Sequence, residues 1–115
     1  MNNSNYTEIY ATQHCASYQC DKLNVYYMDL FGDQIKFNAC SLISLNQKIK
    51  SINLETLLLD PNGADFEVIN LSCIDRLFIF SIEQLIELRD LLEGTFAMIM
   101  LNSEIHSRIR RNIFA

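Results

Sequence analysis

The segment from Phe80 to Gly94 constrains the fold of this chain most, because its sequence specifies where a helix begins. Ser81 is a favourable N-cap residue, and Gln84, three residues later, can bond back to the Ser81 backbone. Phe80 and Leu85 occupy the two positions of a hydrophobic staple. The sequence therefore predicts a helix capped by Ser81, preceded by an apolar strand at residues 77–80.

The predicted helix is amphipathic, with Leu85, Leu88 and Leu92 on one face. Its end allows two interpretations. Gly94 could terminate the helix as a C′ glycine, which would leave residues 95–101 as a strand. We favour one long helix that continues through Gly94, because residues 96 and 99 then extend the apolar face and Ala, Met and Leu favour helices.

The rest of the chain suggests two units with the same order of strand, tight turn, strand and capped helix. They span about residues 24–55 and 66–93, and an offset of 42 superimposes their patterns, although residue identity is poor. True internal duplication and chance similarity of two ββα units both remain open. The predicted elements are strands at 24–31, 34–37, 65–73 and 77–80, turns at 32–33 and 60–63, and a helix at 41–55 capped by Asn38 or Ser41.

These elements predict an α+β fold, with an antiparallel sheet of about four strands built from two hairpins and two helices packed on one face. We expect a single domain over residues 1–115, with residues 1–20 as an N-terminal arm and residues 105–115 as a basic C-terminal tail. Within the arm, residues 1–13 are polar and predict either a loosely held segment or a short edge strand.

Composition limits the class of protein. Half of the residues are hydrophobic and only 3 Gly and 1 Pro occur, which is typical of a globular domain. No apolar run approaches the ~18 residues of a membrane span. The first eight residues have neither a basic nor an apolar region of the kind found in secretion signals. The sequence therefore predicts a cytoplasmic protein without a membrane span.

The charge is unevenly distributed. Three arginines lie in the last eight residues, which leaves six basic and fourteen acidic residues in 1–104, a net charge of −8. An acidic body repels phosphate backbones, so we expect no nucleic-acid partner. The tail around Arg108, Arg110 and Arg111 is interpreted as a solvated end, with contact to an anionic surface or acidic partner as the alternative.

One cluster contains metal-ligand residue types. His14, Cys15 and Cys20 could bind zinc, and Cys40 or Cys73 could supply a fourth ligand. The C-x4-C spacing is wider than that of zinc knuckles, and the competing interpretation is four reduced thiols that serve as small hydrophobic residues. A third alternative is a thiol enzyme in which Cys15 or Cys20 pairs with a histidine, His14 or His106.

Other patterns in the sequence are weaker indications of a functional site. Asp60, Asn62 and Asp65 resemble part of a calcium loop, but Gly63 stands in the wrong place and no Glu follows at the twelfth position, so turn chemistry explains them. His106 lies in a polar terminus and is expected to be exposed. The sequence contains neither a glycine-rich phosphate loop nor a serine nucleophile elbow, and an enzyme is the less favoured class.

Two motifs carry a resemblance to a known family. Residues 30–33 have the sequence Leu-Phe-Gly-Asp, and residues 80–92 have the sequence Phe-Ser-Ile-Glu-Gln-Leu-Ile-Glu-Leu-Arg-Asp-Leu-Leu. Over about residues 15–93 the chain resembles a family of short, functionally uncharacterised bacterial proteins, with two hairpin-plus-helix units and an F-S-x-E-E-L-x-x-L-x-x-L-L helix. Cys15 and Cys20 are spaced more widely than the close pair of that family. The resemblance implies the architecture and no activity.

The sequence thus predicts a small α+β protein that acts as a non-enzymatic interaction module and self-associates, with the zinc or thiol protein as the alternative. The apolar arc of the second helix covers roughly 200° at 100° per residue, more than one small sheet can bury. We expect a homodimer or another protein partner at this surface, with residues 88–101 at or near the contact.

Overall fold

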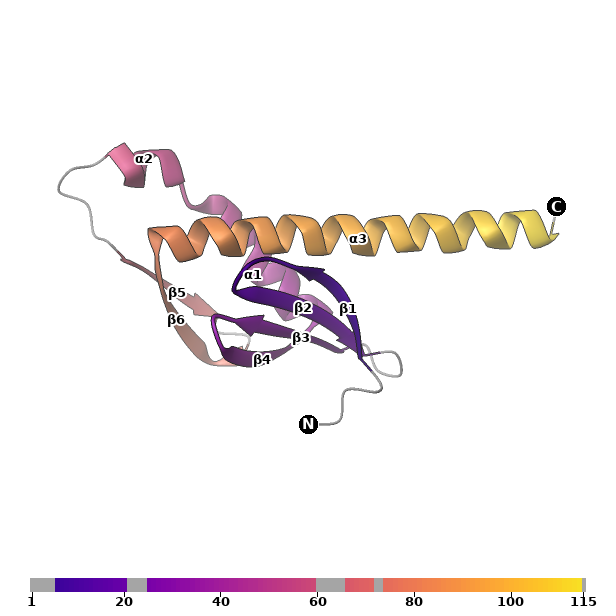
Figure 1. Ribbon diagram of the computed structural model, residues 1–115, viewed down its shortest axis with the longest axis horizontal. Coiled ribbons are helices and arrows are strands. Elements are labelled where there is room, and N and C mark those ends of the chain that lie inside the picture. The colour runs from indigo at the N-terminus through magenta and orange to yellow at the C-terminus, as the bar shows by residue number, and fades with distance from the viewer. Residues whose placement is uncertain (1–5, 21–24, 60–65, 72–73, 115) are drawn as a thin grey trace.

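The computed structural model describes residues 6–20, 25–59, 66–71 and 74–114, with side chains described up to Asn102. Its elements in chain order are strands β1 (Tyr6–Ala11), β2 (Cys15–Cys20), β3 (Val25–Leu30) and β4 (Asp33–Asn38), helices α1 (Ala39–Ser51) and α2 (Leu54–Leu59), strands β5 (Phe66–Leu71) and β6 (Arg76–Ser81), and helix α3 (Ile82–Phe114). Figure 1 shows α3 crossing the body and extending beyond it.

The strands form two antiparallel sheets, which confirms the α+β class. The first has four strands in the order β1-β2-β3-β4, and the second is the two-stranded hairpin β5–β6. The second hairpin is therefore not part of the four-stranded sheet. The N-terminal residues supply the other two strands instead, and β1 is the edge strand that was one of the two expectations for this region.

The loops and caps follow local chemistry. The β3–β4 hairpin turns at Phe31 and Gly32, whose φ angles are 55° and 90°, and the Asp29 carboxylate accepts a bond from the Gly32 N–H at 3.1 Å. Asn38 caps α1 in a capping box with Ser41. The turn expected at residues 60–63 lies outside the described residues.

The helix expected over residues 41–55 is divided in two. The backbone at Ile52 is extended, with φ −78° and ψ 126°, which ends α1 after Ser51. Asn53 then accepts a hydrogen bond from the Thr56 N–H at 3.1 Å and starts α2. The apolar residues of this segment keep a helical spacing across the break, so the pattern did not reveal it. Asn53 lies within that pattern but serves as the cap of a second helix.

Helix α3 begins where the sequence predicts. The Ser81 N–H donates to the Gln84 side chain at 2.9 Å, and the Gln84 N–H donates to the Ser81 hydroxyl at 3.2 Å, which completes the capping box. The helix continues through Gly94, so the expectation of one long helix is confirmed. At about 1.5 Å per residue, its 33 residues extend for roughly 50 Å.

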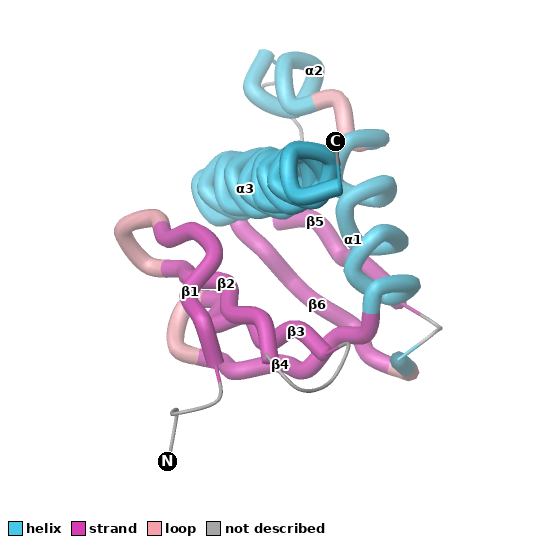
Figure 2. Tube along the Cα trace, turned by 90° about the vertical axis from the view of Figure 1, so that its right-hand side faces the viewer, coloured by secondary structure: helices cyan, strands magenta, loops and turns pink. Residues whose placement is uncertain are grey.

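The core lies between α3, α1 and the inner faces of both sheets. Figure 2 shows the strands curving beneath α3, with α1 beside it. Leu88, Leu91 and Leu92 are fully buried within the chain. The expectation that one sheet leaves this arc uncovered is therefore wrong for these residues, because β1, β2 and α1 also pack on α3. Met100 and Leu101 remain exposed.

The two ββα units are visible as β3–β4–α1 and β5–β6–α3. In each unit a capping box starts the helix directly after the second strand, with Asn38 and Ser81 as the N-caps. Similar order and similar caps do not require duplication of the chain, so the internal repeat stays a prediction. Within the described residues, no helix has both the length and the apolar composition that crossing a membrane requires.

Candidate functional site

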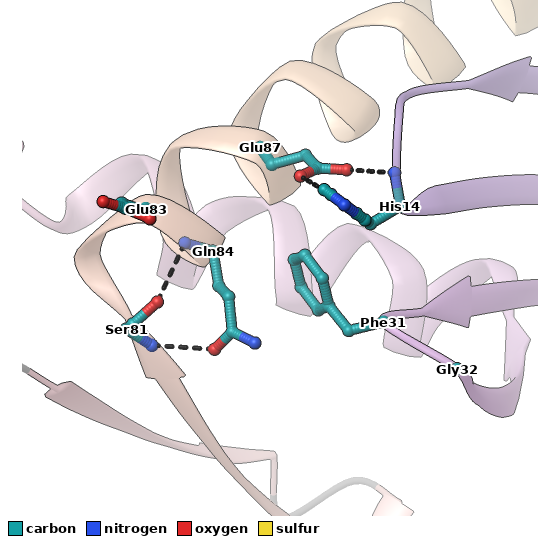
Figure 3. Close-up of a pocket in the computed structure, with 7 residues that line it drawn as sticks. All are labelled: His14, Phe31, Gly32, Ser81, Glu83, Gln84 and Glu87. Atoms are coloured by element: carbon teal, nitrogen blue, oxygen red, sulfur yellow. Dashed lines mark hydrogen bonds and ion pairs between the residues drawn. The ribbon is translucent and has the colours of Figure 1, made fainter.

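A carboxylate on α3 holds the turn between β1 and β2. Glu87 Oε2 accepts hydrogen bonds from the Thr12 hydroxyl at 2.7 Å and from the His14 backbone N–H at 2.6 Å. Glu87 Oε1 lies 3.0 Å from Nδ1 of the His14 ring. A carboxylate only accepts hydrogen bonds when ionised, so Nδ1 carries the proton. Figure 3 shows the imidazole and the carboxylate beside each other at the edge of a pocket.

Local sequence places both partners. The Ser81–Gln84 capping box fixes the first turn of α3, and Glu87 follows on the next turn. On the other side, the Thr12 N–H donates to the Cys15 carbonyl at 2.8 Å and tightens the β1–β2 turn. The His14 carbonyl accepts from the Phe31 N–H at 3.2 Å, which ties this turn to the β3–β4 turn.

These bonds set the charge of Glu87. The hydrogen bond from the His14 side chain, followed by those from the Thr12 hydroxyl and the His14 backbone, lowers the pKa of Glu87 from 4.5 to about 2. Partial burial opposes this shift but is outweighed. Glu87 therefore stays ionised and gives the pocket a negative charge at any pH above about 4.

The pocket beside this pair has a volume of about 580 Å³. Its lining combines carboxylates, an imidazole and one aromatic ring, from His14, Phe31, Gly32, Ser81, Glu83, Gln84 and Glu87. The Ser81 hydroxyl already accepts the hydrogen bond from the Gln84 N–H that caps α3. The lining thus favours a cationic or hydrogen-bonding ligand over an anionic one.

The structure does not bring the four predicted zinc ligands together. Cys15 and Cys20 are buried at opposite ends of β2, whereas Cys40 is exposed in the first turn of α1. His14 is engaged by Glu87. In the part of the chain that the structure describes, no group of three His, Cys, Asp or Glu side chains is placed to hold a metal ion. Cys73 and the side chain of His106 lie outside the described residues.

The environment of Cys15 also disfavours a thiolate. Burial is the main cause that raises the pKa of the Cys15 thiol to about 11, and the charge of Glu87 adds to the shift. A nucleophilic or zinc-binding cysteine requires the opposite shift. Although Cys15 follows His14 directly in the sequence, its side chain is part of the hydrophobic core.

Sequence analysis did not find Glu87. It lies on the polar side of the Leu85–Leu92 helix, where a carboxylate is most simply a solvated surface group. Its partners Thr12 and His14 are 75 and 73 residues away. No local spacing links residues at such distances, so only the fold reveals the pair.

Comparison with known proteins gave no relative: no family model, no curated protein and no solved structure matches this chain.

Proposed function

We propose that this protein is an interaction module that associates with a second copy of itself through the outer face of the β5–β6 hairpin. One observation supports this proposal. Phe66, Val68, Leu77 and Ile79 are large apolar side chains, and each remains between 57% and 60% exposed.

The alternation of the strands explains why these four residues share a face. On the inner face of the hairpin, Ile69, Leu71, Phe78 and Phe80 are buried in the core. Successive strand residues point to opposite faces, so the even-numbered residues of β5 and the odd-numbered residues of β6 point outward. Val68 is directly opposite Ile79, and Phe66 and Leu77 lie at the two ends of this central pair.

The outer face suits a second copy because it is apolar at its centre and carries no charged residue. Around the central Val68–Ile79 pair, Phe66 is directly opposite Ser81 and Leu77 is directly opposite Asn70. None of these six outward-facing residues is charged. Two copies can therefore approach on this face without direct like-charge contact, although the whole chain has a net charge of −5.

The size of the face sets the expected affinity. If each side chain exposes on the order of 100 Å², two copies hide about 800 Å², below the ~1,600 Å² of a standard interface. Burial contributes roughly 25 cal/mol per Å², and association entropy offsets much of it. We therefore expect reversible association at micromolar or higher concentration.

Light scattering over a concentration series tests the proposal with matched variants. Val68→Lys and Ile79→Lys each place a charge at the centre of the face and should keep the protein monomeric. Ile43→Lys is the control, since Ile43 is also a large, exposed apolar residue but lies on α1. The proposal fails if the wild type stays monomeric at several hundred micromolar, or if the control disrupts association as strongly as Val68→Lys.

A further inference from the structure

We propose that the groove between β4 and β6 binds an extended, basic peptide segment, which pairs with the edge of β6. The groove meets the outer face of the hairpin at the edge of β6 and shares Leu77 and Ile79 with it. The proposal does not rest on self-association.

The groove lies between two strand edges. β4 is the last strand of the four-stranded sheet, and β6 pairs with β5 alone among the described strands. An unpaired edge presents backbone N–H and C=O groups that another extended chain can bond. The other edge of this hairpin, that of β5, faces a hollow lined by Lys48, Ser51 and Ile52 at the end of α1.

The residues that line the groove indicate that β6 faces it with its backbone edge. A cavity of about 200 Å³ contacts every residue of β6 from Arg76 to Phe80, together with Asp33 and Ile35 of β4. Neighbouring residues of a strand point to opposite faces. A cavity that contacts five successive residues must therefore face the strand from its edge, where the backbone is accessible.

The groove continues into the pocket beside His14. Phe31 and Gln84 line both cavities, so the path runs along β6 and ends at the first turns of α3. The five β6 residues span roughly 16 Å at ~3.3 Å per residue. A segment of five or six extended residues matches this length.

The charges along the groove and the adjoining pocket indicate which peptide side chains would bind there. Arg76 and Asp33 form an ion pair across one end and neutralise each other. The other end carries Glu83 and Glu87, and the pairing with His14 keeps Glu87 ionised. The centroids of the Phe31 and Phe80 rings lie 6.0 Å apart. The Phe31 ring provides an apolar surface for the aliphatic part of a Lys or Arg side chain. The complementary partner is thus basic at this end.

Fluorescence anisotropy with a labelled six-residue peptide of alternating Lys and Val tests the proposal. The protein is used in the Val68→Lys background, because Val68 does not line the groove and this variant separates peptide binding from self-association. We expect saturable binding that weakens as salt increases. The matched peptide of alternating Glu and Val, and a Lys-Val peptide with N-methylated alternate amides, should both bind at least tenfold more weakly.

Substitutions locate the site. Glu83→Gln should weaken binding about two- to fivefold, as expected for an exposed charge pair. Glu8→Gln, an equal change at an exposed position on β1, should have no effect. The proposal is overturned if the Lys-Val peptide does not bind at millimolar concentration, if the Glu-Val or N-methylated peptide binds as tightly, or if the two variants behave alike.

Discussion

The ring of Tyr10 on β1 packs directly against Gly94 in the middle of α3. A Cβ atom at residue 94 would lie 2.3 Å from the Tyr10 ring, closer than any side chain allows. Packing against Tyr10 therefore favours glycine at this position. A buried contact between the Ser17 and Thr95 hydroxyls, at 2.7 Å, joins β2 to the next residue of α3.

This packing reverses the usual effect of a helix substitution. Replacement of glycine by alanine within a helix ordinarily stabilises by about 0.5–1 kcal/mol. We expect Gly94→Ala to destabilise this protein instead, because the new methyl group displaces the Tyr10 ring. Urea denaturation checks the sign. In a Tyr10→Ala background the same substitution should be stabilising, and an increase in wild-type stability on Gly94→Ala would contradict the described contact.

The Ser81 cap gives a second prediction. Ser81→Ala removes the acceptor of the Gln84 N–H and should lower the free energy of unfolding by about 0.5–2 kcal/mol. Ser81→Asp retains an acceptor and serves as the control, with stability near that of the wild type. Equal melting temperatures of the wild type and Ser81→Ala would mean that the helix begins elsewhere.

The bonds to Glu87 predict a dependence of stability on acid. The folded protein lowers the pKa of Glu87 from 4.5 to about 2, so ionised Glu87 stabilises the fold above pH 4.5. That contribution is lost as the pH falls from about 4.5 through about 2. The difference in unfolding free energy between the wild type and Glu87→Gln should be constant above pH 5 and shrink below it. A difference that does not change with pH would refute the role of the charge.

The cysteines should differ in reactivity. Cys40 is exposed, whereas Cys15 is buried and has its pKa raised to about 11. With a thiol reagent at pH 8, Cys40→Ser should remove one equivalent from the fast phase, and Cys15→Ala should leave that phase unchanged. Elemental analysis of the purified protein accompanies this measurement. Stoichiometric zinc that protects Cys15 and Cys20 from the reagent would restore the metal interpretation.

The parts of the fold that follow from local sequence were predictable. The capping boxes at Ser81 and Asn38, the Gly32 turn and the continuous α3 all depend on residues within a few positions of each other. The break at Ile52 was missed because a cap residue within an apolar repeat gives no periodic signal.

Features that depend on distant residues were not predictable. The polar composition of residues 1–13 predicted either a loosely held segment or a short edge strand, and residues 1–20 were expected to form an arm. Thr12 and Ser17 instead obtain hydrogen-bond partners from α3, 75 and 78 residues further along the chain. Packing of β1, β2 and α1 on α3 buries Leu88, Leu91 and Leu92, which the sequence analysis placed at or near a dimer contact. Exposure of the β5–β6 face likewise depends on which sheet the hairpin joins, and the strand pattern alone does not determine that.

Self-association through this face is the central claim, and methyl NMR over a concentration series tests it most directly. From about ten micromolar to one millimolar, the methyl signals of Val68, Leu77 and Ile79 should shift together along one binding curve. The signals of Ile43 and Ile86, which are exposed on the helices, should stay fixed. Invariant signals from the β5–β6 face, or larger shifts at Ile43 and Ile86, would contradict the claim.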